Sequence, residues 1–546
     1  MVTSETENTG LRFRLRRFYV DSRAPSLGTL DPYASLSRHY ARKSFGVITL
    51  ILFCFVYGFL FSVFSPTYPT LFAAPIISLV LLVIWALPDV NWAPTGLLRS
   101  LFYATFVSLI VWTDYLAISL PGLPWITLLR LTSFPLLLTL LVCISVSAEF
   151  RATILRNFSV IPAIPILLGI FVAIQFISIA FSKDVSTSVQ KFIVAQTTWT
   201  AVFCVSTYIF LRPGEIRRWA CILWIMAIFV SLISIWEAKL GHLPWAGHIP
   251  SFLKIDDESV ESILSPKMRY GTTFYRAQST FTTPLGLAEY LALALPFVLH
   301  FSGKQFVQKV RIAAICSVPL LFYSCYLTNA KLGSIGCLIG VVLYTFGAAY
   351  QSWQLKRDSL LAASTMYGYP IGLTFLIGAL LASHRFQVLI FGNDGSHAAS
   401  TDSRIGQYTR GLQKFLEWPF GYGIGMGAAI INPGVPRARV SIDTYYLSVL
   451  LEYGVAGFIV YYGMFLIAIW EGARRILSKH AADPDRAFLW PISVSLVVFL
   501  VIKSVFSQQD NHPVVFMMLG ALMALASTRK RPSGRDQVDS MLEQDL

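Results

Sequence analysis

Charged residues are scarce in this sequence. Asp, Glu, Lys and Arg make up 13% of the 546 residues, and hydrophobic residues make up 55%. A soluble domain carries about 25% charged residues, so this composition excludes an ordinary soluble protein. The formal net charge of +14 does not indicate a nucleic-acid partner, because the basic residues are spread over short loops between apolar segments.

Patterns typical of metal, disulfide and dinucleotide sites are also missing. The seven cysteines show no CxxC or metal spacing and fall in or beside apolar runs, as small core residues do. Four histidines are expected on the outer face: His242, His248, His384 and His397. No two of them have the spacing of metal ligands together with a third ligand nearby. The glycines of 421–427 are not enclosed by a strand-helix unit. We expect neither a metal nor a cofactor.

Apolar segments dominate what remains. About fourteen are long enough to cross a bilayer, which takes roughly 20 residues each. The sequence therefore predicts an all-α polytopic membrane protein with two large periplasmic loops, and the polar, basic first forty residues contain no cleavable signal. The predicted spans are 44–64, 68–87, 98–119, 124–147, 160–181, 190–210, 216–236, 285–301, 312–328, 332–350, 361–383, 442–470, 487–505 and 512–527.

Loop charges predict the topology. With the N-terminus inside, every second short loop is basic, as at Arg151/Arg156 and Arg474/Arg475, whereas the alternate short loops SPTYPT and LPGLP carry no Lys or Arg. This positive-inside pattern predicts an inner-membrane protein with both termini in the cytoplasm. The expected regions are a basic N-terminal tail (1–43), helices (44–236), a periplasmic loop (237–284), helices (285–383), a large periplasmic catalytic loop (384–441), helices (442–527) and a cytoplasmic tail (528–546).

Two ionisable residues flank the turn LPGLPW almost symmetrically. Two antiparallel helices would bring Asp114 and Arg130 to one membrane depth, where an isolated charge costs about 2.5–3.5 kcal/mol. We expect these side chains to contact each other, directly or through one water. Arg130 is then either a substrate-site residue held by Asp114 or half of a structural ion pair. The GxxxG spacing of Gly336 and Gly340 indicates close helix packing.

The stretch 402–457 is polar and rich in glycine and arginine between apolar segments. Its cations are Arg404, Arg410, Lys414, Arg437 and Arg439. Two other outer-face segments also present cations: Arg276 precedes a Thr-Pro break whose free N–H groups favour an anion, and Lys331 lies in a short link between spans. A pyrophosphate needs several such donors, and arginine binds it with two parallel hydrogen bonds. The alternative is that these cations meet lipid headgroups.

Several segments resemble the O-antigen ligase-like and Wzy-type polysaccharide polymerase membrane proteins. They are STFTTPLGLAEYLALALP, TNAKLGSIGCLIG, Arg404 with the following WPFGYGIGMG, SIDTYYLSVLLEYGVAGF and SQQDNHPVVFMMLGA, within roughly 265–525. The resemblance implies a GT-C-like helical scaffold, metal-independent glycosyl transfer and a substrate linked to undecaprenyl pyrophosphate. It maps the arginines of that family to Arg276 and Arg404.

Two departures from the family pattern matter. Lys331 stands where the family often has arginine, and the chain has no histidine between His397 and His480, whereas ligases carry one at the start of the helix near 442. This favours a polymerase. Asp443 then occupies the place of a general base; it is equally placed to cap the following helix, with Ser441 as a rival cap.

The expected activity is a glycosyltransferase that joins lipid-linked repeat units at the periplasmic face, making exopolysaccharide or O-antigen. The alternatives are a ligase and a lipid-linked glycan flippase. Arg276, Arg404 and Asp443 are assigned to catalysis. Substrate binding is assigned to Lys331, Arg410, Arg437, Arg439, Tyr446, Glu289 and Arg130. The expected partners are the lipid-linked oligosaccharide, membrane lipid, and chain-length and export proteins, with no nucleic acid.

Overall fold

The structure is a computed structural model. It describes residues 52, 54–56, 58, 69–90, 92–119, 125–268, 274–355, 360–382, 395–432, 442–477 and 484–527. The chain divides into two units, residues 1–77 and 78–546. In the first unit the described residues from 52 to 58 are helical, and α3 (Pro69–Trp85) begins near its end. The other elements belong to the second unit.

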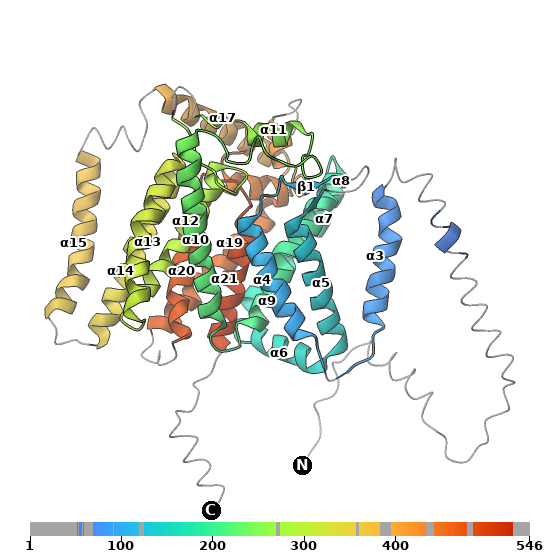
Figure 1. The fold of residues 1–546 in the computed structure, drawn as a ribbon, viewed down its shortest axis with the longest axis horizontal. Helices are drawn as coiled ribbons and strands as arrows, with labels where there is room; N and C mark the ends of the chain where they lie inside the picture. Colours follow the sequence, from blue (N-terminus) through green and yellow to red (C-terminus); the bar gives the residue numbers. More distant parts are fainter. Residues whose placement is uncertain are drawn as a thin grey trace, which may run out of the picture. The chain divides into compact units, whose positions relative to one another are not determined.

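Most of the described residues of the second unit are helical (Figure 1). Its N-terminal half contains α4 (Thr95–Val111), β1 (Ala117–Ile118), β2 (Ile126–Thr127), α5 (Leu128–Val146), α6 (Ala148–Phe158), α7 (Ala163–Ser178), the 3₁₀ turn η1 (Ile179–Phe181), α8 (Val185–Ala195), the π turn η2 (Gln196–Thr200), α9 (Ala201–Ile209), α10 (Glu215–Leu240) and α11 (Glu258–Leu264).

The C-terminal half contains α12 (Pro284–Phe301), α13 (Gln308–Leu327), α14 (Lys331–Leu355), α15 (Leu360–Ala382), α17 (Gly395–Glu417), α18 (Gly427–Ile431), α19 (Tyr445–Leu477), the 3₁₀ turn η4 (Arg486–Phe488), α20 (Leu489–Lys503) and α21 (His512–Ser527). Each span predicted from residue 68 onward contains a helix; the first, 44–64, lies largely outside the described residues.

Nine helices among the described residues are long and apolar enough to cross a membrane. Their outward faces carry large apolar side chains, such as Phe176, Leu232 and Trp236. A water-soluble surface rarely tolerates apolar patches of this extent. The chain is therefore an all-α, membrane-embedded protein, and the two short strands among its described residues form one hairpin.

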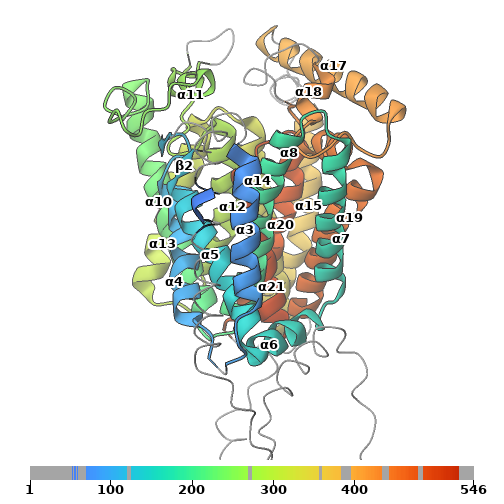
Figure 2. The same cartoon turned by 90° about the vertical axis from the view of Figure 1, so that its right-hand side faces the viewer.

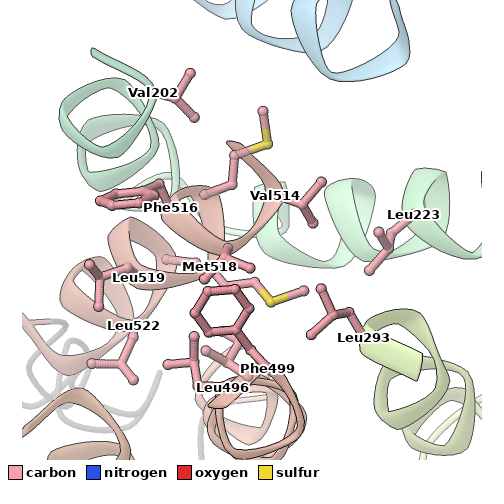
Figure 3. Packing of buried hydrophobic residues seen from close by; sticks show 14 of the residues in the cluster. Val202, Leu223, Leu293, Leu496, Phe499, Val514, Phe516, Met518, Leu519 and Leu522 are labelled. Atoms are coloured by element: carbon pink, nitrogen blue, oxygen red, sulfur yellow. The ribbon is translucent and has the colours of Figure 1, made fainter. Parts of the chain in front are cut away.

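The core of the bundle is formed by helices that are apolar on every side. Residues 514–525 of α21 are all buried, and so is nearly the whole of α12. A helix of this kind must be enclosed by other helices. Figure 3 shows α21 packed by side chains from α9, α10, α12 and α20: Val202, Leu223, Leu293, Leu496 and Phe499.

Close packing of α14 confirms the expectation from the GxxxG spacing. A Cβ atom at Gly336 would lie 2.6 Å from Ile502 Cδ1 of α20, so a larger residue there would push the helices apart.

Both large inter-helix segments lie at one end of the bundle. Figures 1 and 2 show α11 and α17 at the same end and α6 at the opposite end. We call the end that carries α11 and α17 the α17 end. The segment 384–441, predicted as the large loop between two spans, contains two helices, α17 and α18, which the sequence did not predict.

The hairpin at 117–127 changes the predicted geometry of Asp114 and Arg130. The strands pair antiparallel, Ala117 with Thr127, and α4 ends at Val111 rather than near residue 119. Asp114 therefore lies beyond the end of its helix, not within it.

Candidate functional site at the α17 end

The first cluster joins α17 to the start of α19. The Nε atom of Arg404 lies 3.3 Å from Oδ2 of Asp443, and both side chains are partly exposed, at 41% and 33%. One turn further along α17, Gln407 Oε1 accepts a hydrogen bond from the backbone N–H of Asp443 at 2.9 Å. We call the two charged residues the Arg404 pair. Two of the three residues predicted to be catalytic thus meet in space.

Asp443 is not the residue directly before helix α19, the position that an N-terminal cap occupies. Helix α19 begins at Tyr445, so Thr444 occupies the flanking position, and the Asp443 carboxylate is directed to Arg404. Ser441, the rival cap, lies outside the described residues.

The second cluster surrounds Arg276. Its Nε donates to the backbone oxygen of Thr328 at 3.0 Å, in the link that leads to Lys331 at the start of α14. Lys267 lies close enough that the charge of Arg276, added to the larger effect of burial, lowers the pKa of Lys267. Like charges held together in this way favour binding of an anion.

Glu237 fixes the turn that carries Arg276. This fully buried carboxylate at the end of α10 accepts hydrogen bonds from Tyr275 Oη at 2.7 Å, Gln278 N at 3.1 Å and Ser279 N at 2.6 Å. Ser279 has a positive φ of 52°, which a non-glycine residue adopts only when its surroundings hold it. Arg276 lies between these anchored residues. Glu237 and Lys267 were not found from the sequence, because nothing local distinguishes them from other helix-end and loop charges.

The third cluster lies where α12, α20 and α21 meet. Lys503 Nζ is 2.8 Å from Glu289 Oε1, with both side chains fully buried, and it also donates to the backbone oxygen of Gln508. Asn511 Nδ2 donates to Gly286 O at 2.9 Å. We call Glu289, Lys503, Asp510, Asn511 and His512 the Lys503 cluster. His512 stacks on Trp199 with ring centroids 4.9 Å apart.

An acidic residue of the protein occupies the N-terminus of α12. The Thr-Pro break does start this helix: Thr283 caps it by accepting from Gly286 N at 3.1 Å, with Pro284 at the first position. Asp510 Oδ2, however, accepts from Thr282 Oγ1 at 2.7 Å and lies 2.9 Å from a Cβ position built on Gly286. Burial raises the pKa of Asp510, whereas the Thr282 hydrogen bond and the Lys503 charge oppose that rise. The anion expected at this helix end from the substrate is supplied by Asp510 instead.

Two residues assigned to substrate binding are used in packing. Glu289 is fully buried against Lys503, and the Tyr446 hydroxyl donates to the backbone oxygen of Leu500 at 2.6 Å. Neither presents a free polar group to a substrate in this structure, because helix packing satisfies both. Arg410 is exposed on α17, and Arg437 and Arg439 lie outside the described residues.

Asp114 and Arg130 do not form the expected direct contact. NH1 of Arg130 donates to the backbone oxygen of Trp125 at 2.6 Å, and no ion pair joins the two residues although both are described. Asp114 is itself exposed to solvent; the protein around its carboxyl displaces water and, with the charge of Asp510 next, raises its pKa to about 6, while Arg130 lowers it. The predicted contact does not take its direct form, because the Arg130 guanidinium turns to the backbone of its own loop; its other form, contact through one water, stays a prediction.

The glycine segment 421–427 supports α19. Gly421 has a φ of +97°, and a Cβ atom there would lie 2.6 Å from the backbone oxygen of Glu452. Tyr422 N donates to Leu451 O at 2.8 Å, beside the kink of α19 at Gly454. The backbone of this glycine segment therefore approaches another part of the chain closely, at the kink of α19.

No protein-family model matches this chain, and no curated protein matches it. Within the described residues, no group of three or more His, Cys, Asp or Glu side chains is arranged to hold a metal ion.

Proposed function

We propose that the chain is a polysaccharide polymerase of the Wzy type, acting on repeat units linked to undecaprenyl pyrophosphate at the periplasmic face of the inner membrane. The observation that carries the proposal is the Arg404 pair: an arginine and a carboxylate from two distant segments lie 3.3 Å apart at one end of an apolar helix bundle. An arginine suits a lipid-linked phosphate, and a carboxylate suits proton abstraction from a sugar hydroxyl.

The proposed reaction is a glycosyl transfer without a metal. The acceptor hydroxyl oxygen forms a bond to the anomeric carbon of the donor while the bond from that carbon to the phosphate oxygen breaks. The hydroxyl proton passes to Asp443, and the pyrophosphate leaves with the added negative charge. Arg404 and Arg276 stabilise that charge as it develops, and such stabilisation is usually the largest contribution to catalysis.

The contact between Arg404 and Asp443 suggests how the base is released. In the structure the guanidinium holds the carboxylate. An arriving pyrophosphate carries more negative charge and competes for the same guanidinium. Asp443 is then free to accept a proton only when the donor is bound. Lys267 and Lys331 extend the cationic surface beside Arg276.

The proposed topology has fourteen spans, both termini in the cytoplasm and the α17 end in the periplasm. Ser262 of α11 and Ser159 after α6 are both exposed and belong to opposite ends of the bundle. In intact cells, a membrane-impermeant thiol reagent should label Ser262→Cys and not Ser159→Cys. The reverse labelling would place the α17 end in the cytoplasm and remove the mechanism.

The glycans of a deletion strain separate the polymerase from its alternatives. Loss of a polymerase leaves single repeat units on the lipid. Loss of a ligase leaves full polymers on the lipid, and loss of a flippase leaves single units in the cytoplasmic leaflet, protected from external glycosidases. Purified protein should also lengthen lipid-linked units in vesicles. Chain-length and export proteins are proposed as partners in the cell.

One observation bears on the flippase alternative. A transporter places ionisable residues near the membrane midplane, and the Glu289–Lys503 pair is an ion pair inside the helices. Glu289, however, is only five residues after Pro284, which begins α12, so it lies about 8 Å from the helix end at 1.5 Å per residue. Its partner Lys503 is the last residue of α20, so the pair lies in the half of the bundle toward the α17 end, which favours a role in supporting that end.

A further inference from the structure

Helix α17 has three distinct faces. Arg404, Gln407 and Gly411 form the face that contacts the start of α19, where a Cβ atom at Gly411 would lie 2.7 Å from Leu447 Cδ2. Arg410 and Gln413 lie on a polar face that is exposed. The first face packs on the bundle, and the second face is polar and exposed.

The third face is apolar and exposed. Ile405, Tyr408, Leu412 and Leu416 follow a spacing of three and four residues, which places them on one stripe of an α-helix. Leu412 is 52% exposed and Leu416 is 72% exposed. On a helical wheel this stripe lies between the bundle-facing residues and Gln413. The apolar surface of α17 therefore continues sideways from the bundle and remains uncovered within the described part of the chain.

Aromatic side chains indicate what lies against this stripe. Trp418, directly after α17, lies with its ring centroid 6.0 Å from that of Phe181 and 5.5 Å from that of Phe420. Phe181 is the last residue of an apolar span whose outward side chains Phe176 and Ile177 are exposed to lipid in a membrane-embedded chain. Trp418 is therefore at the depth where a span ends, which is where Trp is enriched in membrane proteins.

We infer that α17 is an interfacial helix that lies on the bilayer surface, with the stripe Ile405, Tyr408, Leu412 and Leu416 in contact with acyl chains. Figures 1 and 2 show the helix lying across the end of the bundle rather than along it. An apolar face toward lipid, a polar face toward water and a nearby aromatic anchor are the properties of such helices. The exposed apolar surface of the spans continues into the stripe through Phe181 and Trp418, which favours lipid over a separate protein partner.

This placement has a consequence for Arg404 that rests on the proposed function. Arg404 is on the same helix, so contact of α17 with the bilayer holds the guanidinium at the level of lipid headgroups. A pyrophosphate attached to a membrane lipid lies at that level.

An environment-sensitive fluorophore tests the contact without reference to activity. Single cysteines at Leu412, Leu416 and Gln413 are labelled with NBD in the full chain, and the unsubstituted chain labelled in parallel sets the background from native cysteines. The proteins are reconstituted in phosphatidylethanolamine–phosphatidylglycerol vesicles with and without brominated acyl chains. We expect brominated lipid to quench the probes at 412 and 416 at least threefold more than the probe at 413, and aqueous iodide to show the reverse order.

Two results would overturn the inference. Equal iodide quenching at all three positions would place the stripe in water. Protection of 412 and 416 from both quenchers would mean that protein, from a second copy or a partner, covers the stripe. Gln413 lies between the two test positions on the same helix, so misfolding of α17 would alter all three probes together. Failure of the proposed enzymatic activity would leave these quenching results unchanged.

Discussion

Two ion pairs in this protein have the same chemistry and opposite surroundings. The Glu289–Lys503 pair has 0% exposure on both side chains, whereas the Arg404 pair has 41% and 33%. Removal of one partner from a buried pair leaves an uncompensated charge and is strongly destabilising. A partly exposed pair contributes about 0–1 kcal/mol. The difference indicates that the first pair stabilises the fold and that the second is available for exchange with a charged substrate.

The largest expected effect is on the buried pair. Lys503→Met leaves Glu289 without its cation and should lower the free energy of unfolding by about 3–5 kcal/mol. The double variant Glu289→Leu/Lys503→Met removes both charges and should recover most of that loss. Thermal unfolding in detergent measures both. A single variant as stable as the double variant would show that the pair is not what holds these helices.

Glu237 should show the next largest effect. Glu237→Gln keeps the size but replaces one acceptor oxygen with a donor, so the remaining oxygen cannot accept from the Tyr275 hydroxyl and from the N–H groups of Gln278 and Ser279 together. A buried unsatisfied group costs about 1–3 kcal/mol. Because the turn carries Arg276, polymerisation in vesicles should fall and the KM for the lipid-linked unit should rise. Glu261→Gln, on exposed α11, is the control. A fall in stability with an unchanged KM would assign Glu237 to stability alone.

Arg404→Lys keeps the charge and loses the two-pronged geometry of the guanidinium. We expect a roughly 10–100-fold loss of polymerisation, equivalent to about 1.4–2.7 kcal/mol, with little change in melting temperature because the pair is partly exposed. Arg474→Lys alters another exposed arginine–carboxylate pair, with Glu471 at the end of α19, and should leave activity unchanged. Equal losses in both variants would contradict a specific role for Arg404.

The variant Asp443→Asn distinguishes two roles of Asp443: general base, or structural partner of Arg404. A general base acts in the transition state, so turnover should fall, by up to about 100-fold, more than substrate affinity. Asn removes the charge that pairs with Arg404, whereas the backbone N–H at position 443 still donates to Gln407. Turnover and KM measured in vesicles decide between the roles. Unchanged turnover with a lower melting temperature would leave only the structural role.

The smallest expected effect concerns a carboxylate that makes no ion pair within the described residues. The pKa of Asp114 is raised to about 6, above the roughly 3.9 of an unfolded chain. The carboxyl of Asp114 therefore binds a proton more readily in the folded state than in the unfolded state. Its ionisation destabilises the fold increasingly as the pH rises from about 4 to 6, and fully above about pH 6. Because Asp114 is exposed and solvent screens its charge, Asp114→Asn should raise the melting temperature by no more than about 1 °C at pH 7.5 and by less at pH 4.5. A larger gain at pH 4.5 would reverse the assigned shift.

Hydrophobic runs in the sequence predicted the apolar helices well. They predicted the ends of helices, and helices with polar faces, poorly. Apolar runs of about 20 residues identify helices such as α10 and α12 directly. The low hydropathy of 395–417 concealed α17, because only one of its stripes is apolar. The hairpin at 117–127 shortened α4, since backbone pairing and the turn replace helix where the sequence alone shows a continuous apolar run.

The candidate site was predictable only in part. Arg404 and Asp443 stood out as polar residues beside an apolar helix, and they do meet. Glu237, Lys267 and Asp510 were missed because each resembles an ordinary loop or helix-end charge until its partners are known. The sequence also predicts that the guanidinium groups of Arg276 and Arg404 face one cavity with Lys331 nearby, and a structure with a bound lipid pyrophosphate would test it.

The sequence by itself determined that this is a membrane-embedded helical protein and predicted which loops share a side. Hydropathy and loop charge are sums over neighbouring residues, so they can be read without a fold. Only the tertiary structure decided which charges meet. Lys503 and Glu289 are 214 residues apart in the chain, and Asp510 reaches the start of α12 from the loop before α21. Such contacts depend on how whole helices pack, which no local pattern in the sequence encodes.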